Sequence, residues 1–242
     1  MASTDPDIQM TRVALVTAAS SGIGAACASE LASRGYSIVL MARSDDVHRV
    51  ASGIGGAAMQ GSVTNPDDLE SFVEFAVERF GRIDALVNNT GHPPRGALLN
   101  LSDDEWHDGL DLLLLNVIRA ARLVTPIMER EGGGSIVNVS AFGAVEPSLD
   151  YPVSSTIRAA LSNFAKLFAD RYASLGIRMN NVLPGWIDSH PVDEETSQTI
   201  PMRRAGHVSE VAKTVAFLLS EEASYITGQS IRIDGGLTRS AI

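Results

Sequence analysis

The chain is expected to fold as a doubly wound α/β domain, with one sheet of about seven parallel strands covered by helices on both faces. Short β-branched runs alternate along it with longer amphipathic segments, which is the pattern of strand–helix–strand units. The 242 residues, 45% of them apolar, suit a single core. Residues 1–242 are therefore predicted to form one domain, in which residues 1–11 are a flexible N-terminal segment.

Short runs rich in β-branched and aliphatic residues are predicted to be the strands. They are residues 13–17, 37–41, 57–61, 85–88, 135–140, 177–182 and 230–234. In a doubly wound fold, ligands bind beyond the carboxyl ends of the strands. The segments expected to carry function are therefore 17–24, 42–44, 61–64, 88–91, 140–143 and 184–189.

The segments between these strands have the periodicity and end signals of helices. They are residues 23–31, 66–80, 102–131, 152–175 and 209–220. Asn65 is a suitable cap before Pro66, and Ser102 with Glu105 forms a capping box at the start of the third helix. The centre of that helix, residues 110–118, is apolar on most faces, so it is expected in the core or at a subunit interface.

Composition excludes several classes of function. A net charge of −10 argues against nucleic acid or an anionic membrane as partner, because both bind basic surfaces. The single cysteine, Cys27, allows no disulfide within the chain and is predicted to be a small buried side chain. The N-terminus is polar, no apolar run approaches a membrane span, and the scattered histidines show no metal-ligand spacing. We expect a cytoplasmic protein without a metal site.

Residues 17–24 are the strongest functional signal. They follow an apolar strand and open a helix, so free N–H groups and the helix dipole face any anion that binds there. Small residues let the backbone approach a phosphate closely. Ala18 stands where the usual fingerprint has glycine. This turn predicts a dinucleotide-binding protein.

Several ordered motifs resemble the short-chain dehydrogenase/reductase family, and the match runs from Val13 to Leu237. The cofactor turn is Thr17-x-x-x-x-Gly22-Ile-Gly24, and Asn88-Asn-Thr-Gly91 resembles the family's Asn-Asn-Ala-Gly. The segment 177–185, ending in Pro184-Gly185, resembles the strand and turn beside the nicotinamide, and 226–236 resembles the last strand. The resemblance implies a Rossmann-type fold that binds a nicotinamide cofactor.

The resemblance assigns cofactor contacts position by position. The pyrophosphate and its riboses would be surrounded by Thr17, Ser20, Ser21, Gly22, Ile23 and Gly24. Asn89 and Gly91 would lie near the adenosine ribose. The nicotinamide would be flanked by Pro184, Gly185, Ile187 and Ser189, the last of which stands where the family often has threonine.

The residues after the second strand predict which cofactor is preferred. An NAD site uses an acid there to bond the ribose 2′-hydroxyl, and that acid repels a 2′-phosphate. Here Ala42 removes the repulsion, Arg43 offers a planar cationic fork, and Ser44 offers a hydroxyl. NADP(H) is therefore predicted as the preferred cofactor, with NAD(H) possible. Ser62 and Val63, at the end of the third strand, are also assigned to the cofactor site.

The family's catalytic set does not carry over. Catalysis in the family uses a tyrosine and a lysine four residues apart, with a serine and an asparagine, and this chain contains no Tyr-x-x-x-Lys. An ungapped alignment places Ser154 at the tyrosine position and Arg158 at the lysine position. It places Ala141 at the serine position and Leu113 at the asparagine position. The chain is thus a divergent member in sequence.

Ser140, Tyr151, Ser154 and Arg158 remain as candidate catalytic residues. Tyr151 shares a helix face with Ser154 and Arg158 if the helix includes it, whereas a start at Pro152 places it at the cap. Arg158 can bond the cofactor ribose or steady an oxyanion, but it cannot donate a proton usefully at neutral pH. Ser140 can bond a substrate oxygen. The nearby His92 and His190 are interpreted as surface histidines.

Two functions from different classes remain. The first is an NADP(H)-dependent oxidoreductase acting on a small carbonyl or alcohol, with Tyr151 or a water held by Ser154 and Arg158 as proton donor. The second is a non-catalytic NADP(H)-binding scaffold or redox sensor, which the absence of the usual acid–base set favours. Reuse of the fold for chemistry other than hydride transfer is a third alternative. The resemblance also implies a homodimer or a homotetramer.

Overall fold

A computed structural model describes residues 11–240, and its centre is one parallel sheet of 7 strands. The strands are β1 (Val13–Thr17), β2 (Ser37–Ala42), β3 (Ala57–Gln60), β4 (Ala85–Asn88), β5 (Gly134–Val139), β6 (Ile177–Pro184) and β7 (Ser230–Ile233). Their order, β3-β2-β1-β4-β5-β6-β7, reverses direction between β1 and β4. The predicted fold class is confirmed. The segment 1–11, expected to be flexible, lies outside the described residues except for Thr11.

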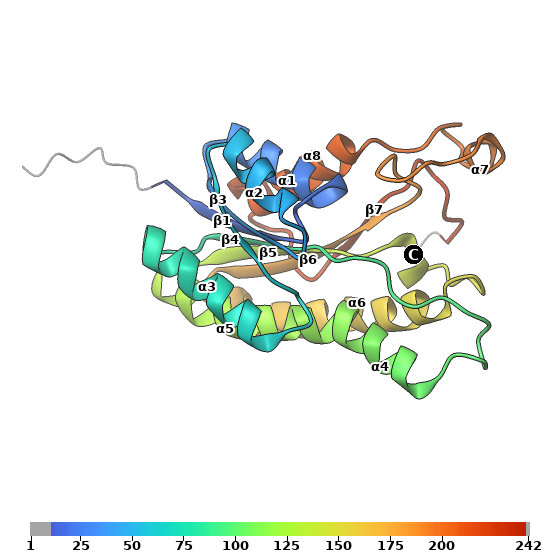
Figure 1. The fold of residues 1–242 in the computed structure, drawn as a ribbon, viewed down its shortest axis with the longest axis horizontal. Helices are drawn as coiled ribbons and strands as arrows, with labels where there is room; N and C mark the ends of the chain where they lie inside the picture. Colours follow the sequence, from blue (N-terminus) through green and yellow to red (C-terminus); the bar gives the residue numbers. More distant parts are fainter. Residues whose placement is uncertain (1–10, 241–242) are drawn as a thin grey trace, which may run out of the picture.

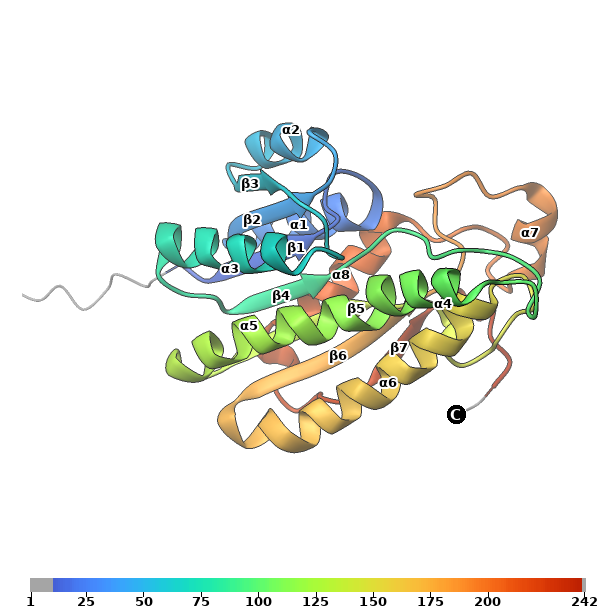
Figure 2. The same ribbon diagram turned by 60° about the horizontal axis from the view of Figure 1, so that its bottom comes forward.

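Helices cover both faces of the sheet (Figure 1). One face carries α1 (Gly22–Ser33), α2 (Asp46–Gly53) and α8 (Val208–Leu219), and the other carries α3 (Pro66–Phe80), α5 (Asn116–Arg130) and α6 (Pro152–Tyr172). Outside these layers are α4 (Asp103–Leu110), α7 (Glu194–Thr199), and the 3₁₀ turns η2 (Phe142–Ala144), η3 (Ala173–Leu175) and η4 (Glu221–Ala223). Figure 2 shows α5 and α6 running side by side. Each layer buries its own apolar cluster against the sheet.

The predicted helix signals operate as expected. The Asn65 side chain accepts a hydrogen bond from the Asp67 backbone, and Pro66 occupies the first turn of α3. The helix ends at Gly81, whose φ of 76° is the left-handed conformation that glycine adopts without strain. At the start of α4, Ser102 and Glu105 make both bonds of the capping box. Local sequence therefore sets where these helices begin and end.

The prediction of one continuous helix over 102–131 is wrong. The segment is divided into α4, a π-helical turn η1 (Asp111–Leu115) and α5. The turn widens the backbone ladder by one residue, and the Asn116 amide donates to the Leu112 carbonyl at 2.6 Å. Sequence analysis also missed α2 and α7, which are short and polar. Strand ends differ from the prediction by no more than two residues, where ladder pairing continues or stops.

A row of buried side-chain amides holds the middle strands in register. The Asn88 amide donates to the Asn138 carbonyl oxygen at 2.9 Å, and Asn138 donates in turn to Asn181 at 2.9 Å. Asn181 donates to the Ser230 hydroxyl at 3.1 Å. Because an unpaired buried amide is costly, shifting any of these strands by one residue would break several bonds at once. The row therefore fixes the carboxyl ends of β4, β5 and β6 relative to one another.

Two further expectations concern burial. Cys27 is buried within the α1 layer, and burial raises the pKa of its thiol to about 12. The interpretation of Cys27 as a buried apolar side chain is thus confirmed. In the described part of the chain, no helix combines the length and the apolar character needed to cross a membrane.

Candidate active site

The turn between β1 and α1 lies at the point where the strand order reverses. Thr17 Oγ1 donates to the Asn89 carbonyl at 2.7 Å and accepts from the Asn89 backbone N–H at 2.9 Å. The Asn89 amide donates to the Ala18 carbonyl at 3.2 Å. These bonds tie the ends of β1 and β4 together. The turn is therefore held rigidly at the crevice where doubly wound folds bind nucleotides.

At Gly24 the turn has no room for a side chain, as close approach of a phosphate to the backbone requires. A Cβ on Gly24 would lie 2.5 Å from the Ala18 carbonyl oxygen and 2.8 Å from the Asn89 amide nitrogen. Ser21 caps α1 without a side-chain hydrogen bond, so the first N–H groups of the helix stay available to an anion. Ala18 itself has a φ of 48°, which explains why glycine is usual at this position. These features fit the pyrophosphate of a dinucleotide.

The residues assigned to the adenosine end form an open surface beside this cradle. Arg43 is exposed, and one guanidinium nitrogen lies 4.0 Å from where a Cβ on Gly91 would be. Asp46 is engaged by Arg49 at 3.4 Å and by the Ser44 hydroxyl at 3.1 Å. Ser44 is thus already bonded within its own loop. Asp45, the other acid that follows Arg43, lies 3.9 Å from His48 Nε2. Within the described residues neither acid is paired with Arg43, so its guanidinium is suited to a phosphate.

The other assigned residues at this end are partly buried. The Ser62 backbone N–H donates to Asp68 at 2.7 Å, and the Ser62 and Thr64 hydroxyls are 2.9 Å apart. Val63 packs against the α3 layer. Ser62 and Val63 therefore lie in an ordered turn after β3, beside the end of β2.

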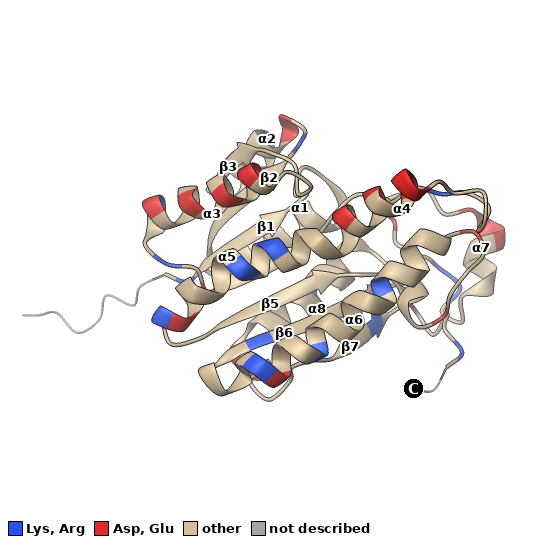
Figure 3. Ribbon diagram, turned by 90° about the horizontal axis from the view of Figure 1, so that it is seen from below, with Lys and Arg blue, Asp and Glu red and all other residues tan. Residues whose placement is uncertain are grey.

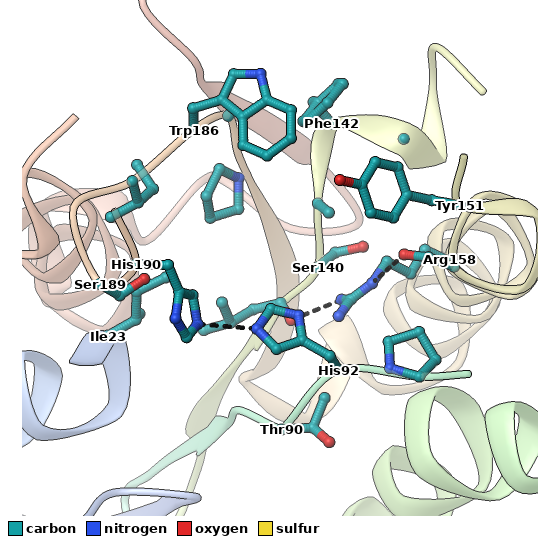
Figure 4. Close-up of a pocket in the computed structure, with 18 of the residues that line it drawn as sticks. Ile23, Thr90, His92, Ser140, Phe142, Tyr151, Arg158, Trp186, Ser189 and His190 are labelled. Carbon is teal, nitrogen blue, oxygen red and sulfur yellow. Dashed lines mark hydrogen bonds between the residues drawn. The ribbon is translucent and has the colours of Figure 1, made fainter. Parts of the chain in front are cut away.

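A cavity of about 470 Å³ opens beyond the ends of β4, β5 and β6. Its wall on the cofactor side contains Ile23 together with the turn after β6, namely Pro184, Gly185, Ile187 and Ser189. The opposite wall contains the four catalytic candidates, Ser140, Tyr151, Ser154 and Arg158. Figure 4 shows Ile23 and Ser189 facing Ser140, Tyr151 and Arg158 across the cavity. The structure thus brings these sequence-predicted residues into one site.

Arg158 is the most unusual residue of this site. It is only 8% exposed, and burial lowers the pKa of its guanidinium to about 10, so it stays cationic at neutral pH. Its Nε donates to the Ser154 hydroxyl at 3.2 Å, one turn earlier on α6, and Nη1 donates to the Val139 carbonyl at 2.9 Å. Ser154 therefore orients the guanidinium, and α6 holds both residues against the end of β5.

Two hydroxyl groups are placed beside it. Ser140 is 6% exposed, and its Oγ has no hydrogen-bond partner among the described residues. Tyr151 is the N-cap of α6, with a non-helical φ of −136°, as a helix start at Pro152 predicted. The Arg95 guanidinium lies over the Tyr151 ring at 4.7 Å, and the Trp186 ring meets it edge-on at 6.3 Å. These contacts hold the Tyr151 hydroxyl pointing into the cavity (Figure 4).

Sequence reasoning missed a contact between His92 and His190. Both line the cavity, and their Nε2 atoms are 2.9 Å apart (Figure 4). Burial lowers the pKa of His92 most, and His190, Arg95 and Arg158 lower it further. Each histidine follows a predicted functional turn, but no local signal pairs two residues so far apart in sequence. Arg95 was missed for the same reason, as was the contact of Trp186 with Tyr151, although Trp186 lies in the predicted segment 184–189.

The family's asparagine position has become part of an apolar cluster. Leu113 lies in the π-helical turn and is 1% exposed. It packs in an apolar cluster with Leu101, which precedes α4, and with Val153 and Ile157, which lie in the first turns of α6. Ala141 lines the cavity next to Ser140. At these two positions the side chains have no group that exchanges a proton. Within the described residues, no group of three or more His, Cys, Asp or Glu side chains is placed to hold a metal ion.

The fold and this site define a nucleotide-binding α/β protein, and comparisons identify its family. Residues 17–238 match a family model described as enoyl-(acyl carrier protein) reductase. The chain is 36% identical to 3-oxoacyl-[acyl-carrier-protein] reductase FabG of Staphylococcus aureus, over 95% of this chain and 99% of that protein. It is 34% identical to FabG of Salmonella typhimurium, over 93% and 97%. The chain belongs to the short-chain dehydrogenase/reductase family, a class of NAD(P)-dependent oxidoreductases.

Solved structures agree with this assignment. The L-sorbose reductase of Gluconobacter frateurii, complexed with NADPH and L-sorbose, superposes with a TM-score of 0.89 at 30% identity, covering 95% of this chain and 97% of that one. YwfH, an NADPH-dependent reductase involved in bacilysin biosynthesis, gives a TM-score of 0.90 at 28% identity, covering 95% and 99%. The predicted family resemblance is confirmed.

Proposed function

We propose that this protein is an NADP(H)-dependent reductase of small carbonyl compounds, or the corresponding alcohol dehydrogenase. The observation that carries this proposal is that a phosphate-binding helix N-terminus and a cavity with catalytic candidates lie next to each other. The N-terminus of α1, whose cap residue Ser21 makes no side-chain hydrogen bond, opens beside a cavity. In that cavity the buried cation Arg158 and the Ser140 hydroxyl, which has no partner among the described residues, face the cofactor side. Phosphate binding and carbonyl polarisation are thus available side by side.

The cofactor residues are those of the cradle and the two turns that flank it. The pyrophosphate and riboses would be held by Thr17, Ser20, Ser21, Gly22, Ile23 and Gly24. The adenosine half would contact Asn89, Gly91, Ser62 and Val63. The nicotinamide half would contact Pro184, Gly185, Ile187 and Ser189. Arg43 and Ser44 face the 2′-phosphate of NADP(H), in line with the NADPH named for L-sorbose reductase and YwfH. Held by these residues, NADPH would supply the hydride that reduces the carbonyl carbon.

The catalytic roles follow from the chemistry of the cavity wall. Tyr151 donates the proton to the carbonyl oxygen, because it is the acidic hydroxyl that points into the cavity. Ser140 Oγ donates a hydrogen bond to the same oxygen, and its lack of another partner supports this role. Arg158, oriented by Ser154, stabilises the negative charge that develops and bonds the cofactor ribose. A water held by Ser154 and Arg158 is the alternative proton donor.

Loss of the Tyr151 hydroxyl tests the proposal. Removing a general acid typically lowers a rate by about 10²–10⁴-fold, so Tyr151→Phe is expected to lower kcat at least tenfold. The substitution keeps the ring under Arg95 and against Trp186, and the binding of NADPH should not change. The measurement is NADPH oxidation across a panel of small ketones and aldehydes, with product identification.

Tyr172→Phe is the matched control, because that tyrosine lies at the far end of α6 and outside the cavity. An unchanged kcat in Tyr151→Phe removes Tyr151 from the mechanism and favours the water. Tight NADPH binding without turnover of any carbonyl favours the second function, a non-catalytic NADP(H)-binding scaffold or redox sensor. A product formed without cofactor oxidation indicates other chemistry on this fold.

Self-association is part of the proposal. Half-buried leucines on the π-helical turn and the exposed Leu167 on α6, at 67%, leave apolar surface on the layer formed by α5 and α6, which run side by side (Figure 2). A homodimer or homotetramer formed through this face covers that surface. The single, buried Cys27 supports a reducing, cytoplasmic location.

A further inference from the structure

The charge of the cavity is opposite to that of the protein. The sequence has a net charge of −10, and acidic residues are prominent on α3 and α4 (Figure 3). Among the described residues that line the cavity there is no aspartate or glutamate, whereas Arg95, Arg158, His92 and His190 all line it. A cavity lined by basic side chains attracts negatively charged ligands, even in a protein whose net charge is negative. The cavity therefore favours an anion.

Arg158 strengthens this inference because its charge is buried without a carboxylate. Its two described partners, the Ser154 hydroxyl and the Val139 carbonyl, are neutral, and Nη2 has no hydrogen-bond partner among the described residues. Buried charges in proteins are normally paired, since their desolvation is costly. A ribose hydroxyl is neutral, so the cofactor ribose does not provide a negative charge to pair with Arg158. An anionic group on the substrate would provide it.

The shape and lining of the cavity restrict the rest of the ligand. Phe142, Tyr151 and Trp186 form an aromatic wall, with Phe142 and Trp186 ring centroids 6.0 Å apart. Arg95 lies over Tyr151 at the exposed rim, so its guanidinium is a second cation within reach of a ligand that stacks there. A volume of about 470 Å³ suits a compact molecule.

We propose that the substrate is a 2-oxo acid with an aromatic or branched side chain, whose carboxylate is bound by Arg158 and Arg95. This inference rests on the proposed reductase function and names its substrate class. A planar 2-oxo acid presents a carboxylate oxygen and the carbonyl oxygen on one edge, so one guanidinium serves both. The carbonyl carbon gains a hydride from NADPH, the oxygen gains the Tyr151 proton, and the carboxylate is unchanged. The product is a 2-hydroxy acid, with NADP⁺ formed stoichiometrically.

Binding of an unreactive pair tests the anion site without any turnover. Phenylacetate and phenylacetamide differ in charge but have nearly the same shape, and each is titrated by calorimetry into protein saturated with NADP⁺. Charge-assisted hydrogen bonds to a guanidinium predict that phenylacetate binds about 10–100-fold more tightly. Arg95→Gln is expected to lower this ratio of affinities severalfold, because only Arg158 then remains to bind the carboxylate. Arg79→Gln, which also removes an arginine stacked on an aromatic ring but lies on α3, is expected to retain it.

Equal affinity of the two compounds overturns the inference. The inference also fails if phenylacetate binds the free protein but is displaced by NADP⁺. In that case Arg158 and Arg95 bind the phosphates of the cofactor rather than a substrate carboxylate.

A reactive pair separates this inference from the proposed function. Phenylglyoxylate and its methyl ester carry the same ketone, and the inference predicts a kcat/KM at least tenfold higher for the acid. An ester that is reduced as fast as the acid, or faster, overturns the substrate class and leaves the reductase function standing. If neither is reduced although phenylacetate binds with NADP⁺, the anion site stands and the reductase function fails for this class.

Discussion

At the scale of single residues, Arg43 is the position that we propose sets the preference for NADP(H). The second strand ends in Ala42 rather than in an acid, and one Arg43 guanidinium nitrogen lies 4.0 Å from where a Cβ on Gly91 would be. Of the two acids that follow Arg43, Asp46 is paired with Arg49 at 3.4 Å and Asp45 lies 3.9 Å from His48 Nε2. The sequence predicted this role because residue type and strand end are both local properties.

Substituting Arg43 tests the preference for NADP(H). Arg43→Gln is expected to weaken NADPH binding by about 10–100-fold, the value of one or two charge-assisted hydrogen bonds, while NADH binding changes little. The measurement is the dissociation constant of each cofactor by fluorescence titration. Arg49→Gln, in the same loop but paired with Asp46, is the control and should not alter the ratio. An equal loss of affinity for NADPH and NADH would show that Arg43 does not recognise the 2′-phosphate and acts only through its general attraction for anions.

At the scale of elements, the turn before α1 combines chemistry with a packing constraint. Gly24 has no space for a Cβ, because the Ala18 carbonyl and the Asn89 amide already occupy it. The motif therefore predicts both a helix start and a rigid connection to β4. The π-helical turn is the opposite case, since no local pattern marks it. It depends on how α4 and α5 pack against the start of α6, and sequence analysis predicted one continuous helix there.

A methyl group at Gly24 tests the cradle. Gly24→Ala is expected to destabilise the protein by about 1–3 kcal/mol, the usual cost of overpacking, and to abolish measurable NADPH binding. Gly53→Ala is the matched control, since Gly53 ends α2 and a Cβ there meets nothing within 4 Å. It is expected to be neutral or to stabilise by up to about 1 kcal/mol. Urea unfolding and cofactor titration measure both; normal NADPH binding in Gly24→Ala contradicts the cradle.

At the scale of the whole molecule, charge distribution bears on assembly. Acidic side chains mark α3 and α4, whereas α5 and α6 carry arginine and lysine with few acids (Figure 3). Because the net charge is −10, two copies repel least where acids are sparse. The face with exposed Leu167 is therefore the one best suited to self-association.

A charge placed on that face tests the assembly. Light scattering after gel filtration is expected to give two or four times the chain mass of 25.7 kDa. Leu167→Glu should shift the protein toward a single chain, because a buried unpaired carboxylate in each copy opposes contact. Leu99→Glu, at a loop position that is 92% exposed, should leave the mass unchanged. A native chain that elutes as a monomer at micromolar concentration contradicts the proposal.

The sequence by itself determined the strands and the family, because each depends on neighbouring residues or on motifs in fixed order. The prediction of a phosphate-binding turn at residues 17–24 rests on the same kind of local signal. It also placed Ser140, Tyr151, Ser154 and Arg158 among the candidates, since each lies at a strand end or on the helix that follows. Only the tertiary structure decided that these side chains face one cavity, that His92 meets His190, and that Arg158 is buried without an acid. The physical reason is that strand order and helix packing bring together loops far apart in sequence, and only then is the charge of the cavity defined.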